Sequence, residues 1–191
     1  MKKIAITGII GSGKSTATEL FKQLDIPVFI ADEFAKELME NDNQVVNKLS
    51  SYFGNIAYKN GKLNKTYISN RIFNNISDLK FINSLVHPIV NDKFKSWCNT
   101  QQASYVIYES ALVFENGSEE IFDEIICVKT PINIIHQRIS MRENYSFEKI
   151  NKIIENQISQ NVKCKKSTHC ITNDSIENLK RNIINIHNKL A

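Results

Sequence analysis

The sequence predicts an α/β fold in which a parallel sheet of five strands lies between layers of helices. Apolar segments rich in β-branched residues alternate along the chain with segments whose apolar residues recur at helical spacing. Near the amino terminus, a strand, a helix and a second strand follow one another closely, as in a βαβ unit with a right-handed crossover. This alternation is typical of folds built on a parallel sheet.

The five predicted strands are short, and each is followed by a turn or a helix. They cover residues 2–7, 26–31, 104–110, 123–130 and 168–172. The first predicted helix, over residues 15–24, carries apolar residues on one face. In the last helix, which follows the fifth strand, apolar residues again gather on one side.

Two helical stretches interrupt this alternation. The longer one, residues about 32–100, has no obvious buried strand, and Pro88 suits the first turn of one of its helices. The shorter one covers residues about 137–165, where Ser146 can cap a helix. We expect two insertions in a single chain, whose core comprises residues about 1–31, 101–136 and 166–191.

Composition limits the classes of function. The 191 residues carry a net charge of only +4, which is weak evidence for a nucleic-acid partner. The apolar runs fall far short of the ~20 residues that span a bilayer, and the amino terminus lacks the apolar segment of a signal peptide. We therefore expect a cytoplasmic protein with no membrane partner and no requirement for oligomerisation.

The four cysteines lack the close CxxC pairing of a metal site, and the sequence predicts that they are free thiols. One segment places His169 beside Cys170, six residues after Cys164. This group lacks the fourth ligand and the usual spacing of a structural zinc site.

The segment "GIIGSGKST", residues 8–16, matches the pattern G-x-x-x-x-G-K-[ST] between a predicted strand and a predicted helix. Glycines allow backbone amides to approach a ligand closely, and a helix amino terminus favours an anion. The pattern predicts a three-layer P-loop NTPase fold that binds ATP and Mg²⁺. The expected nucleotide-binding residues are Gly11, Ser12, Gly13, Lys14, Ser15 and Thr16, with Lys14 acting on the phosphates and Ser15 also on the metal.

Further polar side chains follow the predicted strands, and parallel strands end at one edge of a sheet. Asp32 could orient an acceptor hydroxyl as a base or simply cap a helix, and Glu109 could hold Mg²⁺ or be a solvated strand end. Arg138 and Arg142 lie four residues apart on one helix face, where they could stabilise a transferring phosphoryl group or form a surface stripe.

Several segments, in order and spacing, resemble bacterial dephospho-CoA kinases almost from end to end. They are "ITGIIGSGKST", "ADEFAKEL", "GKLNKTYISNRIF", "LVHPIV", "ESALVFENG", "RISMRE" and "ENQISQNVK". The resemblance implies transfer of the ATP γ-phosphate to the 3′-hydroxyl of dephospho-CoA, giving coenzyme A and ADP. It also implies an adenylate-kinase-like core, a helical acceptor-binding insertion and a small helical lid.

The resemblance also implies roles for single residues. Asp32 falls at the family's base, and Arg138 and Arg142 fall in the lid. Lys65, His87 and Glu115 fall in motifs of the acceptor side, and Asn173 falls near the expected adenine site. The chain departs from the family pattern at Ile30, Lys65, Ala111 and Ile153, where the family commonly has aspartate, arginine, proline and arginine.

Two other functions fit the same phosphate loop. A nucleoside or nucleoside-monophosphate kinase would share the fold and differ in its acceptor. A nucleotide-switch protein would have no small acceptor and, if linked to nucleic acid, would bind a polyanion in a salt-sensitive way. The mild charge and the lack of a basic run argue against the switch protein.

Overall fold

The structure is a computed structural model. It describes residues 1–143 and 145–191, and the side chains of all of these except 142 and 143. The chain folds as two compact units. The first consists of Met1–Ile30 and Cys98–Ala191, and the second of Ala31–Trp97. None of the helices in the described residues is long and apolar enough to cross a membrane.

The first unit is built on a parallel sheet, as predicted. Its five strands lie in the order β2-β5-β1-β6-β7 and are β1 (Lys2–Thr7), β2 (Val28–Ile30), β5 (Tyr105–Glu109), β6 (Glu124–Lys129) and β7 (His169–Thr172). Strand β1 lies between β5 and β6, with Ile6 opposite both Glu109 and Ile126. The ends of β1 and β5 are therefore neighbours at one edge of the sheet.

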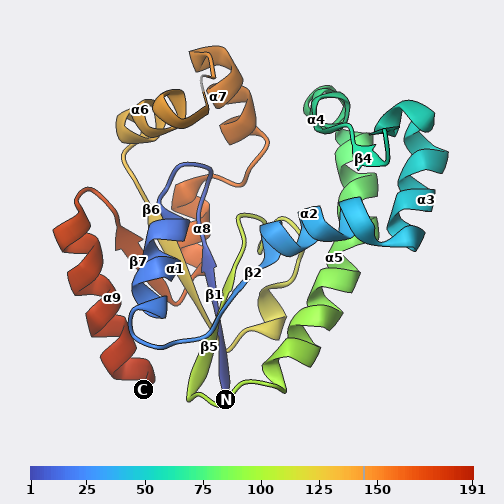
Figure 1. The fold of residues 1–191 in the computed structure, drawn as a ribbon. Coiled ribbons are helices and arrows are strands. Elements are labelled where there is room, and N and C mark those ends of the chain that lie inside the picture. The colour runs from blue at the N-terminus through green and yellow to red at the C-terminus, as the bar shows by residue number, and fades with distance from the viewer. Residues whose placement is uncertain (144) are drawn as a thin grey trace. The chain divides into compact units, whose positions relative to one another are not determined.

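Helices cover both faces of this sheet. Helices α1 (Lys14–Lys22) and α9 (Ile176–Leu190) contact each other on one face (Figure 1). Helix α8 (Gln160–Lys166) contacts β6 and β7. Since neighbouring strand residues point to opposite faces, Ala5, Val106 and Cys127 lie on the face opposite the one that α1 and α9 cover, and all three are fully buried. The remaining helices of the unit are α6 (Ile132–Glu143), α7 (Phe147–Glu155) and the short η2 (Glu119–Ile121).

The second unit contains helices and one small antiparallel ribbon. The helices are α2 (Ala31–Asn41), α3 (Asn43–Phe53), the short η1 (Asn55–Ala57), α4 (Lys65–Asn74) and α5 (Ile76–Cys98), and the ribbon strands are β3 (Tyr58–Lys59) and β4 (Lys62–Leu63). The Asn60-Gly61 turn that joins the ribbon has positive φ at both residues, as a tight hairpin requires.

The expectation that Pro88 begins a helix is wrong, because Pro88 lies inside α5. Proline has no N–H to donate to the carbonyl four residues earlier, which usually weakens or ends a helix. Here the helix continues, and buried Val86, Val90 and Phe94 mark its packed face on both sides of the proline. Burial of this face therefore outweighs the lost hydrogen bond.

The expectation of four free thiols is also wrong. Cys164 of α8 and Cys170 of β7 form a disulfide, with their Cα atoms 5.2 Å apart. Their separation in sequence is not a recognised pairing motif, and only the turn between α8 and β7 brings them together. Cys98 and Cys127 are free and buried, and burial raises the pKa of the Cys127 thiol to about 11.

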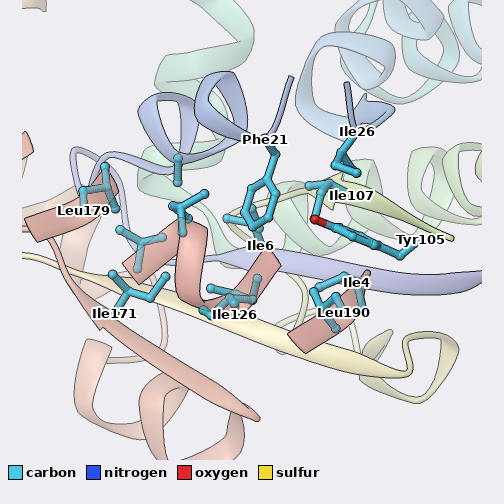
Figure 2. Packing of buried hydrophobic residues seen from close by; sticks show 14 residues of the cluster. Ile4, Ile6, Phe21, Ile26, Tyr105, Ile107, Ile126, Ile171, Leu179 and Leu190 are labelled. Carbon is cyan, nitrogen blue, oxygen red and sulfur yellow. The ribbon is translucent and has the colours of Figure 1, made fainter. Parts of the chain in front are cut away.

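A continuous apolar core joins α1 and α9 to the sheet. It contains Ile4 and Ile6 of β1 and Ile126 of β6 (Figure 2), together with Ile183 of α9, and all four are fully buried. Phe21 of α1 is also fully buried, and its ring meets the edge of Tyr105 with centroids 6.2 Å apart. This packing fixes α1, and so the loop before it, against the sheet.

Truncation of the core aromatic should destabilise the protein strongly. We expect Phe21→Ala to lower the free energy of unfolding by about 3–5 kcal/mol, because it removes buried apolar surface and leaves a cavity. Chemical denaturation followed by circular dichroism measures the change. Ile184→Ala is the control, since Ile184 of α9 is 48% exposed, and its effect should stay within about 0.5 kcal/mol. Equal effects would contradict this account of the core.

Candidate active site

The predicted phosphate loop lies between β1 and α1, and its backbone requires glycine at three positions. Gly8 has φ 153°, and a Cβ on it would lie 2.4 Å from the Val128 carbonyl oxygen. Gly11 has φ 74° and Gly13, which caps α1, has φ 91°. A Cβ on Gly13 would lie 2.0 Å from Asn173 Nδ2, and one on Gly11 would lie 2.9 Å from the Ile139 side chain. These glycines thus allow left-handed backbone and also close packing against neighbouring side chains.

The orientation of the loop is set by the Ser12 carbonyl. It accepts hydrogen bonds from the Thr130 hydroxyl at 2.7 Å and from the Asn173 amide at 2.9 Å. Both donors are buried and come from the ends of β6 and β7. In a trans peptide the N–H points opposite to the carbonyl, so the Gly13 N–H points away from these donors. The loop is thus held with an amide available to an anion at the amino terminus of α1.

Two polar side chains of the loop are buried. Ser12 Oγ is buried and has no hydrogen-bond partner among the described residues. The Lys14 ammonium donates to the carbonyls of Gly8 at 3.1 Å and Ile9 at 3.2 Å, and Lys14 is 8% exposed. A phosphate bound at the loop could accept hydrogen bonds from the unpaired Ser12 hydroxyl and from the Lys14 ammonium.

Glu109 occupies the end of β5 beside the loop and is 5% exposed. Its carboxylate accepts hydrogen bonds from Ser15 Oγ at 3.0 Å and from Thr18 Oγ1 at 2.8 Å. Within the described residues, no group of three or more His, Cys, Asp or Glu side chains could hold a metal ion. The Ser15–Glu109 pair nevertheless supplies the oxygen ligands that Mg²⁺ prefers when phosphates and water complete its shell.

Arg138 of α6 also reaches the loop. Its Nη1 atom lies 3.5 Å from the position that a Cβ on Gly13 would occupy. The Arg142 backbone belongs to α6, but its side chain lies outside the described residues. Thr16 is exposed in the first turn of α1. The loop, Glu109, Asn173 and Arg138 therefore form one cluster in the first unit.

The second unit carries three further candidates on three different helices. Asp32 is exposed in the first turn of α2. Lys65, at the start of α4, forms an ion pair with Glu40 at 2.7 Å. His87 lies in α5, and burial lowers the pKa of its imidazole below the usual value, which favours the neutral ring at pH 7.

Glu115 is held by partners within the first unit. Its carboxylate forms an ion pair with Lys163 at 2.8 Å and accepts a hydrogen bond from the Ile158 N–H at 2.9 Å. Sequence reasoning did not single out Thr18, Thr130, Lys163 or Gln157 as site residues. Gln157 and Lys163 lie in the segment "ENQISQNVK", but their contacts with the loop and with Glu115 depend on strand order and helix docking, which the segment does not reveal.

The comparisons with known proteins decide the family. The dephospho-CoA kinase family model matches residues 2–178. The chain belongs to the dephospho-CoA kinase family. It is 34% identical over 173 residues to the dephospho-CoA kinase of Bacteroides fragilis strain YCH46, an alignment that covers 90% of this chain and 84% of that protein. It is 32% identical to the Coxiella burnetii dephospho-CoA kinase, with 99% and 96% covered.

Solved structures show the same fold. The crystal structure of TT1252 from Thermus thermophilus matches with a TM-score of 0.86 and 27% identity, covering 100% of this chain and 98% of that one. Dephospho-CoA kinase from Campylobacter jejuni matches with a TM-score of 0.69 and 24% identity, covering 98% and 96%. Shikimate kinase from Bacteroides thetaiotaomicron matches with a TM-score of 0.54 and 12% identity, covering 99% and 98%. These likenesses show the fold, and membership of the family makes the chain a kinase; its five-stranded parallel sheet is the one that the sequence predicted.

The packing beneath the phosphate loop generates a prediction. We expect Gly13→Ala to weaken ATP binding by at least about tenfold, which corresponds to about 1.4 kcal/mol, because the new methyl group would displace Asn173 and release the Ser12 carbonyl. Isothermal titration calorimetry with ATP measures the loss.

Gly61→Ala is the matched control for backbone strain. Gly61 has a similar φ of 74°, but a Cβ there would meet no atom within 4 Å. We expect this variant to bind ATP as the unaltered protein does. Normal ATP binding by Gly13→Ala would contradict the role of the Asn173 contact.

Proposed function

We propose that this kinase transfers the γ-phosphate of ATP to the 3′-hydroxyl of dephospho-CoA, forming coenzyme A and ADP. The observation that carries the proposal is the oriented phosphate loop, with its Gly13 amide, Lys14 and the Ser15–Glu109 pair, in a member of this family. In the reaction, the acceptor oxygen forms a bond to the γ-phosphorus while the bond from that phosphorus to the β-phosphate oxygen breaks.

On the nucleotide side, we assign the β-phosphate to the amides of Gly11, Ser12 and Gly13, with Lys14 neutralising charge on the β- and γ-phosphates. Ser15 and Glu109 would hold Mg²⁺, which supplies charge neutralisation to the phosphates when it is bound. The contacts of both residues support this assignment, because they place a hydroxyl and a carboxylate together at the amino terminus of α1.

Further nucleotide contacts are assigned to residues around the loop. Thr16 in the first turn of α1 would reach the α-phosphate, and Asn173 would lie near the adenine. Arg138, whose guanidinium lies near Gly13, would stabilise charge on the transferring phosphoryl group together with Arg142. Residues about 137–165 would form a lid that excludes water and so prevents wasteful hydrolysis of ATP.

On the acceptor side, we assign Asp32 as the group that orients the hydroxyl and accepts its proton. Lys65, His87 and Glu115 would contact dephospho-CoA. A lysine at position 65 keeps the positive charge of the family's arginine but loses its forked hydrogen bonding. We also propose that the kinase acts in the cytoplasm and without an obligatory partner protein.

An acceptor panel tests the proposal. The protein is incubated with ATP and Mg²⁺ and with dephospho-CoA, adenosine, AMP or shikimate, and ADP release and the phosphorylated product are measured. We expect product with dephospho-CoA alone. Product with adenosine or AMP instead would favour the nucleoside or nucleoside-monophosphate kinase, and ATP hydrolysis without any acceptor product would contradict the proposed transfer.

Asp32→Asn tests the proposed base. We expect a kcat about 10²–10⁴-fold lower with unchanged ATP affinity, because proton transfer is impaired while the phosphate loop is untouched. Glu33→Gln is the matched control, since Glu33 is a second exposed carboxylate in the same first turn of α2. Steady-state kinetics of both variants should separate them, and equal kcat values would remove Asp32 from the chemistry.

A further inference from the structure

Lys163 of α8 carries a buried ammonium that the proposed chemistry does not use. Its side chain is fully buried. The ammonium donates to the Ala111 carbonyl and to both carboxylate oxygens of Glu115, at 2.8 and 2.9 Å. Removing two charges from water is costly, and a buried ion pair often adds little stability over apolar side chains of the same size. The presence of this buried ion pair therefore points to a role in fixing one conformation of the chain.

The ion pair between Lys163 and Glu115 is connected to the phosphate loop through Gln157 and Ile158. Glu115 Oε1 also accepts the N–H of Ile158 at 2.9 Å. The preceding residue, Gln157, turns its side-chain carbonyl to the N–H of Ile10, again at 2.9 Å. Ile10 is the third residue of the loop pattern that starts at Gly8. A continuous set of contacts thus runs from the ion pair through the Gln157–Ile158 backbone to the loop.

Apolar packing supports the same connection. Ile9 of the loop packs with Ile135 and Ile139 of α6 and Ile150 of α7, all buried, and Ile10 packs at the edge of this cluster. Such packing resists separation but has little directional preference. The hydrogen bond from Ile10 to Gln157 has a defined direction, and it therefore sets which way this peptide of the loop faces.

We propose that Glu115 and Lys163 are positioning residues for ATP binding: together they hold Gln157 against the Ile10 amide and keep the phosphate loop in its ligand-ready conformation. This role is additional to the direct acceptor contact assigned to Glu115 above. A loop held in its bound conformation loses less conformational freedom when ATP binds. Loss of the pair should therefore raise the KM for ATP, and loss of the acceptor contact of Glu115 would add a rise in the KM for dephospho-CoA.

The test uses a double variant, because a single substitution would leave one buried charge unpaired. Glu115→Leu with Lys163→Met removes both charges and also the acceptor of the Ile158 N–H, and Gln157→Ala breaks the contact with Ile10 directly. We expect each variant to fold, with about tenfold weaker ATP binding and tenfold higher KM for ATP. Combining all three substitutions should weaken ATP binding no more than twofold further, because residues in one chain of contacts are not additive.

The matched control is the ion pair between Lys166 of the same helix and Glu119, at 3.5 Å, with side chains 50% and 32% exposed. Glu119→Leu with Lys166→Met makes the same two substitutions at this exposed pair and should bind ATP normally. Lys163→Arg, which keeps the positive charge, should retain most of the ATP affinity if it folds.

Three results would overturn the proposal. Unchanged ATP binding in Gln157→Ala would show that its contact with Ile10 is not needed, and this substitution leaves the buried charges intact. Multiplicative losses in the triple variant would show that the pair and Gln157 act separately. A rise in the KM for dephospho-CoA alone would assign Glu115 to acceptor binding.

The inference rests on ATP binding at the loop, which the proposed function requires. Calorimetric titration of the unaltered protein with ATP, in the absence of any acceptor, checks this requirement separately. If ATP does not bind, the proposed function fails at its first step. If ATP binds and the variants behave like the control, only the inference about the positioning pair fails.

Discussion

The orientation of the Ser12 peptide is the constraint on which the nucleotide site depends. Its carbonyl is held on one side by Thr130 and Asn173, so the next N–H faces the other side. These two donors directly follow β6, which neighbours β1 in the sheet, and β7, which lies beyond β6. The loop is therefore not a self-contained motif, because its conformation is completed by the carboxyl ends of β6 and β7.

The parallel sheet accounts for the charges that meet at this edge. Strands β1 and β5 are direct neighbours with aligned ends, so the buried Glu109 carboxylate lies beside the amino terminus of α1. Hydroxyl groups of Ser15 and Thr18 hold it there. A carboxylate in this position is favoured by the helix dipole and is oriented before any ligand arrives.

The segment that contains α6 and α7 is attached to the loop by apolar packing and by polar contacts. Isoleucines of both helices pack against Ile9, and Gln157 receives the Ile10 N–H. The disulfide from Cys164 to Cys170 ties α8 to β7, close in sequence to both Lys163 and Asn173.

The sequence by itself determined the α/β class, the five parallel strands and the phosphate loop, because these depend on local periodicity and on a short motif with adjacent strand and helix. It also indicated Glu109 as a candidate site residue, because Glu109 lies at the end of a predicted strand. Only the tertiary structure decided that Thr130 and Asn173 hold Ser12, that Cys164 pairs with Cys170, and that Lys163 meets Glu115. These partners are far apart in sequence or lack a motif, and they meet only through strand order and helix docking.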